Sequence, residues 1–402
     1  MIFNQLKNSV FIKEILEKDG QVFIVGGAVR DNFLKLPIKD IDLLVTGIEL
    51  QDLETILKQS GKAELVGKSF GVIKFKTDQI DLDEPIDVAL PRTDVKIGDG
   101  HKGFEVKVDH NLPIETDLHR RDFTINAMAI NLSTNELIDP FDGLKDIKSK
   151  TLRMVNESSF IDDPLRMMRG LQFASRFEGF EFDPLTFEKI QENAHLIKEI
   201  SGERILMELE KIVSKNGDMD KALNLLNSSG IFNEFFNVQN YINKFKKLKK
   251  SRLDFYFELL LSFGSNIGTV FRKKLSGDAQ TAKALDVAFE AYMYSDNFYY
   301  KNRSNKNYRL QMSKFFGKSK MILDFNLLNA TLNSARLEMK FELIPKSIQE
   351  LEINGHDVME ILEINEGSRL GEVLNILLES VYKGEINNNR NELIDKLKNL
   401  KN

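Results

Sequence analysis

Two aspartates separated by a single residue, Asp40 and Asp42, carry the clearest chemical signal in this sequence. They flank Ile41 at the start of an apolar run that predicts a β-strand, and residues two apart in a strand point to the same face. Carboxylates held this close repel each other and need a cation, and Mg²⁺ prefers oxygen ligands. The pair therefore predicts a magnesium site. Asp87, in the segment PIDVAL, could reach the same metal from a neighbouring strand, and a solvated strand end is the alternative.

Two glycines precede these acids. Gly26 and Gly27 follow the apolar segment VFIV and come before a predicted helix. Without side chains they let backbone N–H groups approach phosphate oxygens at the start of a helix. Arg30, one turn into that helix, could clamp a triphosphate. A glycine pair alone indicates only a turn, and the order of glycines and acids makes the signal specific.

The elements that position these residues can be inferred from the hydrophobic pattern. Residues 21–90 alternate short apolar runs with a helical stretch at 49–59, a pattern typical of a small mixed sheet with helices. Residues 92–104 are rich in glycine and charge, which predicts a mobile loop. From about residue 160 apolar residues recur at helical spacing, so the rest of the chain is predicted to be mainly helical.

Composition excludes several classes of protein. The 402 residues include 42% hydrophobic and 29% charged residues, which is ordinary for a globular protein with several domains. There is no cysteine, which excludes disulfides, thiolate zinc sites and a cysteine nucleophile. No apolar run approaches the roughly 20 residues that span a bilayer. We expect a cytoplasmic protein with no membrane association, and no protein partner is evident.

Six motifs in a fixed order resemble the class II tRNA nucleotidyltransferases (CCA-adding enzymes) and the related bacterial poly(A) polymerases. They are GGAVRD at 26–31, DID at 40–42, RRDFTINAMA at 120–129, DPFDGLKDI at 139–147, DDPLRMMR at 162–169 and SGERILMELEKI at 201–212. The stretch LEINGHDVM at 351–359 also looks like the tail of bacterial CCA-adding enzymes.

The resemblance implies an α+β fold class, with a polymerase-beta-like nucleotidyltransferase head followed by an all-helical neck, body and tail. We expect the catalytic head at residues 1–150, the neck with its base-recognition helix at 151–230, the body at 231–345 and an RNA-binding tail at 346–402. The implied reaction adds CMP and AMP from CTP and ATP to the tRNA acceptor arm, with Mg²⁺ as cofactor.

Three other functions stay open at this point. They are a poly(A) polymerase, a specialist that adds only CC or only A, and a catalytically silent RNA-binding protein on the same scaffold. A small-molecule nucleotidyltransferase is disfavoured by the long helical tail. The segment VGKSFGVIKF at 66–75 lacks the extended basic sequence of many poly(A) polymerases, which favours tRNA as the substrate.

The resemblance also assigns residues that bind the nucleotide. Arg121 would contact the nucleotide and Asp122 would lie near the ribose hydroxyls, with Asn126 supporting that contact. The alternative is an Arg–Asp pair that joins two strands.

Asp163 and Arg166 lie three residues apart on a predicted helix. In the family such a pair reads the base, because the carboxylate accepts from the exocyclic amine of cytosine or adenine while the guanidinium donates to the ring. Arg169 would contact the phosphates or the base, and a helical salt bridge without function is the alternative. The chain departs from the family pattern at Asp162, where Glu is usual, and at Gln172, where a further Arg is common.

Two basic clusters are candidate RNA contacts. Residues 297–320 contain seven Lys or Arg and interleaved aromatic rings, and here we single out Lys301, Arg303 and Lys306. The second cluster is KFKKLKKSR at 244–252. His356 forms the chain's only His-Asp doublet, and we interpret it as structural because a metal site needs several converging ligands.

Overall fold

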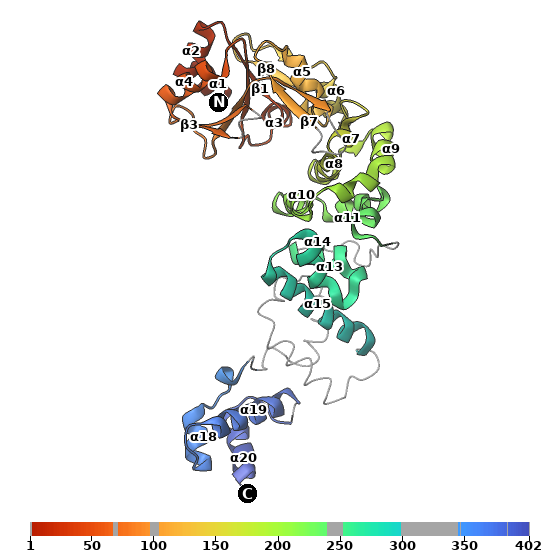
Figure 1. The fold of residues 1–402 in the computed structure, drawn as a ribbon. Helices are drawn as coiled ribbons and strands as arrows, with labels where there is room; N and C mark the ends of the chain where they lie inside the picture. Colours follow the sequence, from red (N-terminus) through yellow and green to blue (C-terminus); the bar gives the residue numbers. More distant parts are fainter. Residues whose placement is uncertain are drawn as a thin grey trace. The chain divides into compact units, whose positions relative to one another are not determined.

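The computed structural model describes residues 2–66, 71–96, 104–238, 252–298, 345, 347–383 and 385–401. The chain divides into two compact units, residues 1–239 and 240–402. The first unit contains a head built on a β-sheet and a helical neck that follows it (Figure 1). Each unit is described by itself below.

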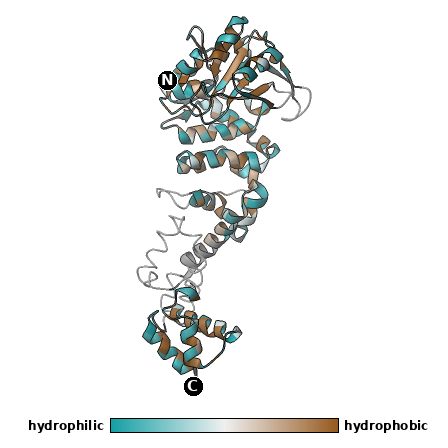
Figure 2. Ribbon diagram, turned by 90° about the vertical axis from the view of Figure 1, so that its left-hand side faces the viewer, coloured by the Kyte–Doolittle hydropathy of each residue, from teal (hydrophilic) through white to brown (hydrophobic). Residues whose placement is uncertain are grey.

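The head is organised around a seven-stranded sheet with the order β3-β4-β5-β2-β1-β8-β9. Its pairs are antiparallel except for β2 with β5. The central strands are buried and apolar, as Figure 2 shows in brown, because both faces of the sheet are covered. The strands are β1 (Gln21–Val25), β2 (Asp42–Thr46), β3 (Lys62–Val66), β4 (Val72–Lys76), β5 (Ile86–Ala89), β8 (Ala129–Asn131) and β9 (Leu137–Ile138).

Helices cover the two faces of this sheet. On one face α5 contributes Ile114 and Leu118 to a core that includes Phe23 and Leu44. Elsewhere in the head Phe11 of α2 packs edge-on against Phe75 of β4, with ring centroids 4.9 Å apart. The helices of the head are α1 (Ile2–Asn8), α2 (Val10–Glu17), α3 (Gly27–Phe33), α4 (Leu50–Ser60), α5 (Ile114–His119), the 3₁₀ turn η1 (Thr124–Asn126) and α6 (Gly143–Ser149).

The prediction of a loop over residues 92–104 is wrong at both ends of that range. β6 (Arg92–Lys96) and β7 (Phe104–Val108) form a separate two-stranded antiparallel sheet. Thr93, Val95, Val106 and Val108 are β-branched, and such residues favour a pleated backbone. Residues 97–103 lie outside the described part of the chain.

The neck follows the head and consists of short helices. Its longest helices are α8 (Leu165–Arg176) and α10 (Gly202–Ser214), whose buried faces pack together. Gly170 lets α8 approach the head, because an added Cβ would lie 2.6 Å from Cζ of Phe123. The other elements are β10 (Thr151–Leu152), α7 (Ser159–Asp162), β11 (Glu181–Phe182), α9 (Pro184–Asn193), η2 (Ala194–Glu199), α11 (Met219–Ser228) and α12 (Ile231–Phe236).

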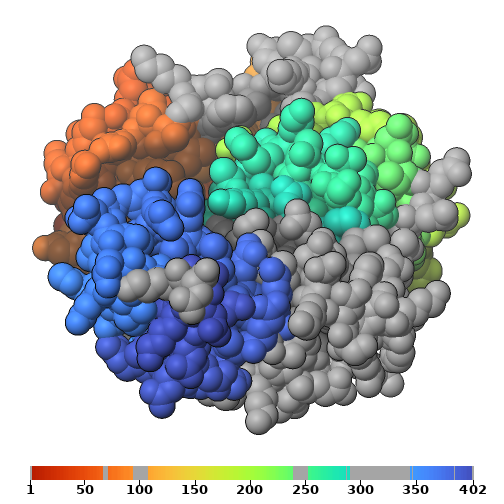
Figure 3. Space-filling view, turned by 90° about the horizontal axis from the view of Figure 1, so that it is seen from below, coloured from red at the N-terminus to blue at the C-terminus, as the bar shows by residue number. Residues whose placement is uncertain are grey.

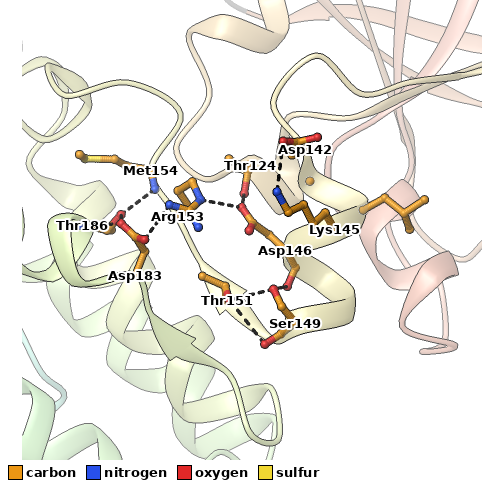
Figure 4. Close-up of polar contacts among 12 residues, drawn as sticks. Thr124, Asp142, Lys145, Asp146, Ser149, Thr151, Arg153, Met154, Asp183 and Thr186 are labelled. Atoms are coloured by element: carbon orange, nitrogen blue, oxygen red, sulfur yellow. Dashed lines mark hydrogen bonds and ion pairs between the residues drawn. The ribbon is translucent and has the colours of Figure 1, made fainter.

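A polar network joins the head to the neck (Figure 4). Arg153 lies between two acids, with Nε 3.2 Å from Asp146 Oδ2 and Nη1 2.6 Å from Asp183 Oδ1. Asp146 belongs to α6 of the head, where it also accepts a hydrogen bond from Thr124 Oγ1 at 2.7 Å. Asp183 caps α9 of the neck. One guanidinium therefore connects the last helix of the head with the neck.

The second unit is helical in its described part. Residues 252–298 form α13 (Arg252–Leu260), η3 (Leu261–Asn266), α14 (Ile267–Leu275) and α15 (Ala279–Phe298). The tail forms η6 (Ile348–Glu350), α18 (Gly355–Leu362), α19 (Ser368–Tyr382) and α20 (Arg390–Lys401). The tail helices, blue in Figure 3, enclose their own apolar core around Leu377 and Leu393.

His356 lies on the exposed first turn of α18. The neighbouring Asp357 takes part in a capping box with Asn354 and forms an ion pair with Arg390 of α20. These contacts give Asp357 a role in joining two tail helices, and the structural role of His356 stays a prediction.

The predicted α+β fold class is confirmed by the sheet-based head and the helices that follow it. Among the helices of the described residues, none is both long enough and apolar enough to cross a membrane. The finer division into head, neck, body and tail at residues 150, 230 and 345 stays a prediction.

Candidate active site

The predicted acids Asp40, Asp42 and Asp87, here called the acid edge, lie at the N-terminal ends of the parallel strands β2 and β5. Asp42 begins β2 and pairs with Val25 of β1 on one side and with Asp87 of β5 on the other. Because β2 and β5 run parallel in this register, Asp42 and Asp87 lie side by side on adjacent strands. Asp40 is exposed and lies just before β2. The structure thus places Asp42 beside Asp87. The prediction that Asp40 shares a strand with Asp42 is wrong, because β2 begins only at Asp42.

The charges of these acids interact. Desolvation by the surrounding protein raises the pKa of Asp42, and repulsion from Asp87 and Asp40 acts in the same direction, while Arg121 and Lys74 oppose it. Lys74 of β4 donates from Nζ to Asp87 Oδ1 at 2.9 Å. Asp87 thus already has a cationic partner. In the part of the chain that the structure describes, no group of three or more His, Cys, Asp or Glu side chains is arranged to hold a metal ion.

Gly26 occupies the tight turn between β1 and α3. Its φ of 68° and ψ of −126° lie in a region that other residues rarely adopt. An added Cβ would lie 2.5 Å from Nη1 of Arg121 and 3.7 Å from Oδ2 of Asp42. The missing side chain therefore leaves room for Arg121 beside the acids. At Gly27 an added Cβ would make only an ordinary contact of 3.6 Å with Arg30.

Arg121 is held in place by an acid that the sequence analysis missed. Asp117 is fully buried, and its Oδ2 accepts from Nε and Nη2 of Arg121 at 3.2 and 3.0 Å. Its Oδ1 accepts from Arg120 at 2.8 and 2.6 Å. Burial alone would raise the pKa of Asp117, but the two arginines outweigh it and lower the pKa. The spacing of Asp117 to the arginine pair, three and four residues along a helix, was a visible signal for this contact.

Arg30, Asn126, Asp122 and Arg169 form a line of polar contacts. Arg30 donates from Nη1 to Asn126 Oδ1 at 2.6 Å, and Asn126 donates from Nδ2 to Asp122 Oδ1 at 2.9 Å. Arg169 of α8 donates from Nε to Asp122 Oδ2 at 2.7 Å. The line connects α3, η1 and α8, so it ties the helix after the glycines to the predicted base-recognition helix.

Asp122 and Arg30 are buried within this line. Desolvation opposes the charge of Asp122, but Arg169, Asn126 and the N–H of Phe123 outweigh it and lower the pKa to about 2. Arg30 also pairs with Asp31 at 2.7 Å. Both Asp122 oxygens and all three Arg30 nitrogens accordingly serve contacts within the protein. This arrangement favours a positioning role for both residues, and their predicted contacts with ribose and triphosphate stay predictions.

Asp163 does not lie on the predicted helix. It has an extended backbone between α7 and α8, because the following Pro164 disfavours a helical conformation for the residue before it. Its Oδ1 accepts from the N–H of Leu165 at 3.2 Å and lies 3.7 Å from Arg204 of α10. Asp163 and Arg166 therefore do not form the helical ion pair that was the alternative.

Arg166 is anchored from two sides. Its Nη1 donates to Ser159 Oγ at 3.0 Å, and its Nη2 donates to the carbonyl of Arg120 at 2.6 Å. Within the described chain, neither Arg166 Nε nor Asp163 Oδ2 has a hydrogen-bond partner. Arg166 Nε and Asp163 Oδ2 are thus left as a donor and an acceptor, the two kinds of group that reading a base edge requires.

Several predicted positions fall elsewhere. Asp162 accepts from Ser158 Oγ at 2.7 Å within α7, and Gln172 is buried beside Arg176. Lys301, Arg303 and Lys306 lie outside the described residues, as does nearly all of the basic cluster at 244–252. The RNA contacts assigned to them remain predictions.

Family models match three consecutive stretches of this chain. Residues 22–153 match the poly A polymerase head domain, residues 179–242 match a model described as "Probable RNA and SrmB- binding site of polymerase A", and residues 269–397 match tRNA nucleotidyltransferase domain 2. The chain belongs to the tRNA nucleotidyltransferase and poly(A) polymerase family. Its acid edge, Gly26 turn and Arg121 all fall within the family's head domain.

Individual relatives of this family member are CCA-adding enzymes. The CCA-adding enzyme of Lactococcus lactis is 28% identical over 97% of this chain and 96% of its own length. That of Blochmanniella floridana is 40% identical, but the match covers only 47% of this chain and 43% of the relative. The Thermotoga maritima CCA-adding enzyme, solved in a complex with tRNA, has a TM-score of 0.69 at 22% identity over 98% of this chain and 94% of its own. This last likeness establishes the shared fold.

Proposed function

We propose that this protein adds CMP and AMP to the 3′ end of tRNA to build the CCA end, releasing pyrophosphate. The observation that carries the proposal is the acid edge formed by Asp40, Asp42 and Asp87 next to Arg121 at the Gly26 turn. Two features of the relatives support it. Full-length similarity is to a CCA-adding enzyme, and a structural neighbour was solved with tRNA. We place the reaction in the cytoplasm, where a cysteine-free tRNA enzyme is expected to work.

Magnesium is the cofactor that the acid edge would hold. Asp42 lies beside Asp87 and two residues after Asp40, and carboxylate oxygens suit a hard divalent cation. We assign Asp40 and Asp42 as its ligands, while Asp87 is engaged by Lys74. When bound, such ions activate the attacking hydroxyl and neutralise the triphosphate.

The protein's own residues orient the nucleotide. Arg121, fixed by buried Asp117 next to the acid edge, would donate to the phosphates where negative charge develops. Asp163 Oδ2 would accept from the exocyclic amine of cytosine or adenine, and Arg166 Nε would donate to the ring. Uracil and guanine present a carbonyl in place of that amine, so they meet an acceptor and are rejected.

Product length tests the proposal. A tRNA ending at its discriminator base is supplied with CTP, ATP or both, and the products are resolved at single-nucleotide length. We expect two additions with CTP alone and three with both. A long A tail with ATP alone would indicate a poly(A) polymerase, and one addition only to a tRNA ending in CC would indicate an A-adding specialist.

The control for chemistry is Asp42→Ala, which should abolish incorporation while leaving the far-UV circular dichroism unchanged. Undiminished activity of this variant would refute the metal assignment. Absence of any incorporation by the wild type, with tRNA binding retained, would favour the RNA-binding alternative.

A further inference from the structure

Arg176, the last residue of α8, is held in its orientation by the buried side-chain amide of Gln172. Gln172 lies one turn earlier and is 1% exposed. With its amide oxygen facing Arg176, that oxygen accepts from Nε at 3.1 Å and from Nη1 at 2.5 Å. The guanidinium also lies over the ring of Phe177, 5.4 Å from its centroid. In the described residues Arg176 forms no ion pair with an acid, so its charge is oriented but not neutralised.

A second arginine uses the same aromatic ring. Arg30 lies 4.9 Å from the centroid of Phe177, and it also borders Gly27 at the start of α3. Desolvation and repulsion from Arg30 lower the pKa of Arg176, while Asp31 and Glu208 act in the opposite direction. Arg176 therefore lies on the side of the neck that faces the glycine turn.

The turn after α10 brings a third cation to this place. The N–H of Asp218 donates to the carbonyl of Ser175 at 2.7 Å, and a Cβ at Gly217 would lie 3.3 Å from Cγ of Arg176. Lys215, in the same turn, is exposed, and no ion pair of its side chain is found in the described chain. Desolvation and repulsion from Arg176 lower its pKa, whereas Asp40 raises it, so Lys215 also lies within electrostatic reach of the acid edge.

We propose that Arg176 and Lys215 form a polyphosphate-binding pair for the incoming nucleoside triphosphate. Two cations without acid partners repel each other, and an anion placed between them relieves that repulsion. Their position beside Arg30 and near Asp40 favours the β- and γ-phosphates of a nucleotide over phosphates of the RNA backbone. The inference rests on the proposed function only in requiring a nucleoside triphosphate at the acid edge.

The test compares ligands that differ only in the phosphate chain. Dissociation constants for CTP and CMP are measured by calorimetry with Mg²⁺ and without tRNA, for the wild type, Arg176→Lys, Arg176→Gln and Lys215→Gln. We expect each Gln variant to weaken CTP binding about tenfold and CMP binding less than about twofold. Arg176→Lys should recover part of the loss. Lys148→Gln, an exposed lysine on α6, is the matched control and should change neither constant.

Two outcomes would overturn the inference. The first is equal weakening of CTP and CMP binding, which a merely structural role would produce. The second is an unchanged dissociation constant for CTP in both Gln variants. Lys215→Gln keeps the test valid if Arg176→Gln fails to fold, because Lys215 is exposed. Nucleotide binding is measured without tRNA, so a failure of CCA addition would leave this result standing.

Discussion

Replacing Asp122 by Asn should destabilise the first unit by a magnitude that the structure defines. An asparagine amide would place its NH₂ group toward Arg169 Nε, so two donors would face each other where Asp122 Oδ2 now accepts at 2.7 Å. The pKa shift from 3.8 to about 2 corresponds to about 2–3 kcal/mol of stability at neutral pH, since one unit equals about 1.36 kcal/mol. We therefore expect the free energy of unfolding to fall by about 2–4 kcal/mol.

The pH dependence separates this charge effect from simple loss of packing. Because the folded-state pKa is depressed, the contribution of Asp122 is complete above about pH 4 and is lost as the pH falls toward 2. The difference between wild type and Asp122→Asn should shrink to about half by pH 3. Urea unfolding followed by circular dichroism at pH 7, 4 and 3 measures this difference.

The chain supplies two controls for this experiment. Asp142→Asn changes an acid that is 75% exposed, and it should alter the free energy of unfolding by less than about 0.5 kcal/mol. The second control is tyrosine fluorescence. All eight tyrosines lie beyond residue 240 and the chain has no tryptophan, so this signal reports the unfolding of the second unit only. A loss below about 0.5 kcal/mol at pH 7, or one independent of pH, would refute the assigned role of Asp122.

Three further predictions concern Gly26, Arg153 and Asp42. Gly26→Ala should lower kcat/KM for CTP at least tenfold and lower the free energy of unfolding by about 1–3 kcal/mol, because a methyl group there is strained and displaces Arg121. Gly27→Ala, where a Cβ makes only an ordinary contact, should leave the free energy of unfolding nearly unchanged. Arg153→Ala should lower the free energy of unfolding of the first unit by about 1 kcal/mol, a small value because Arg153 is 46% exposed and its ion pairs are screened by solvent. An unchanged urea midpoint would contradict its role in connecting the head with the neck. Asp42→Asn should raise the free energy of unfolding at pH 7 but not below about pH 4, because its raised pKa makes the charged form costly in the fold; the same urea titrations check this, and lower stability at pH 7 would contradict it.

The strands that carry the acid edge could be predicted from the sequence, because the hydrophobic pattern of a strand depends only on neighbouring residues. Asp42 and Asp87 each lie in a short apolar run, which is enough to predict a strand at each place. That the two acids are neighbours depends on the register of β2 with β5. The glycine turn was likewise visible, since Gly26 follows an apolar strand directly. The change to helical spacing after about residue 160 predicted that the rest of the chain is mainly helical, while the α+β fold class was implied by the family resemblance.

Contacts between distant elements were not predictable in the same way. Lys74 meets Asp87 only because β4 pairs with β5 in one particular register. The predicted helical pair failed at Asp163, where Pro164 sets an extended backbone and the side chain turns toward Arg204 instead. Burial of Asp122 between Asn126 and Arg169 depends on how α8 packs on the head, which a single chain pattern does not specify.

The polar line from Arg30 through Asn126 and Asp122 to Arg169 also constrains how this protein can change over evolutionary time. Each residue of the line forms a hydrogen bond with its neighbour, so a change at one position alone leaves a buried charge or donor without its partner. Substitutions along the line should consequently appear as matched pairs among descendants. A lineage that alters its nucleotide preference through α8 would then carry a compensating change in α3 or η1, far away in the sequence.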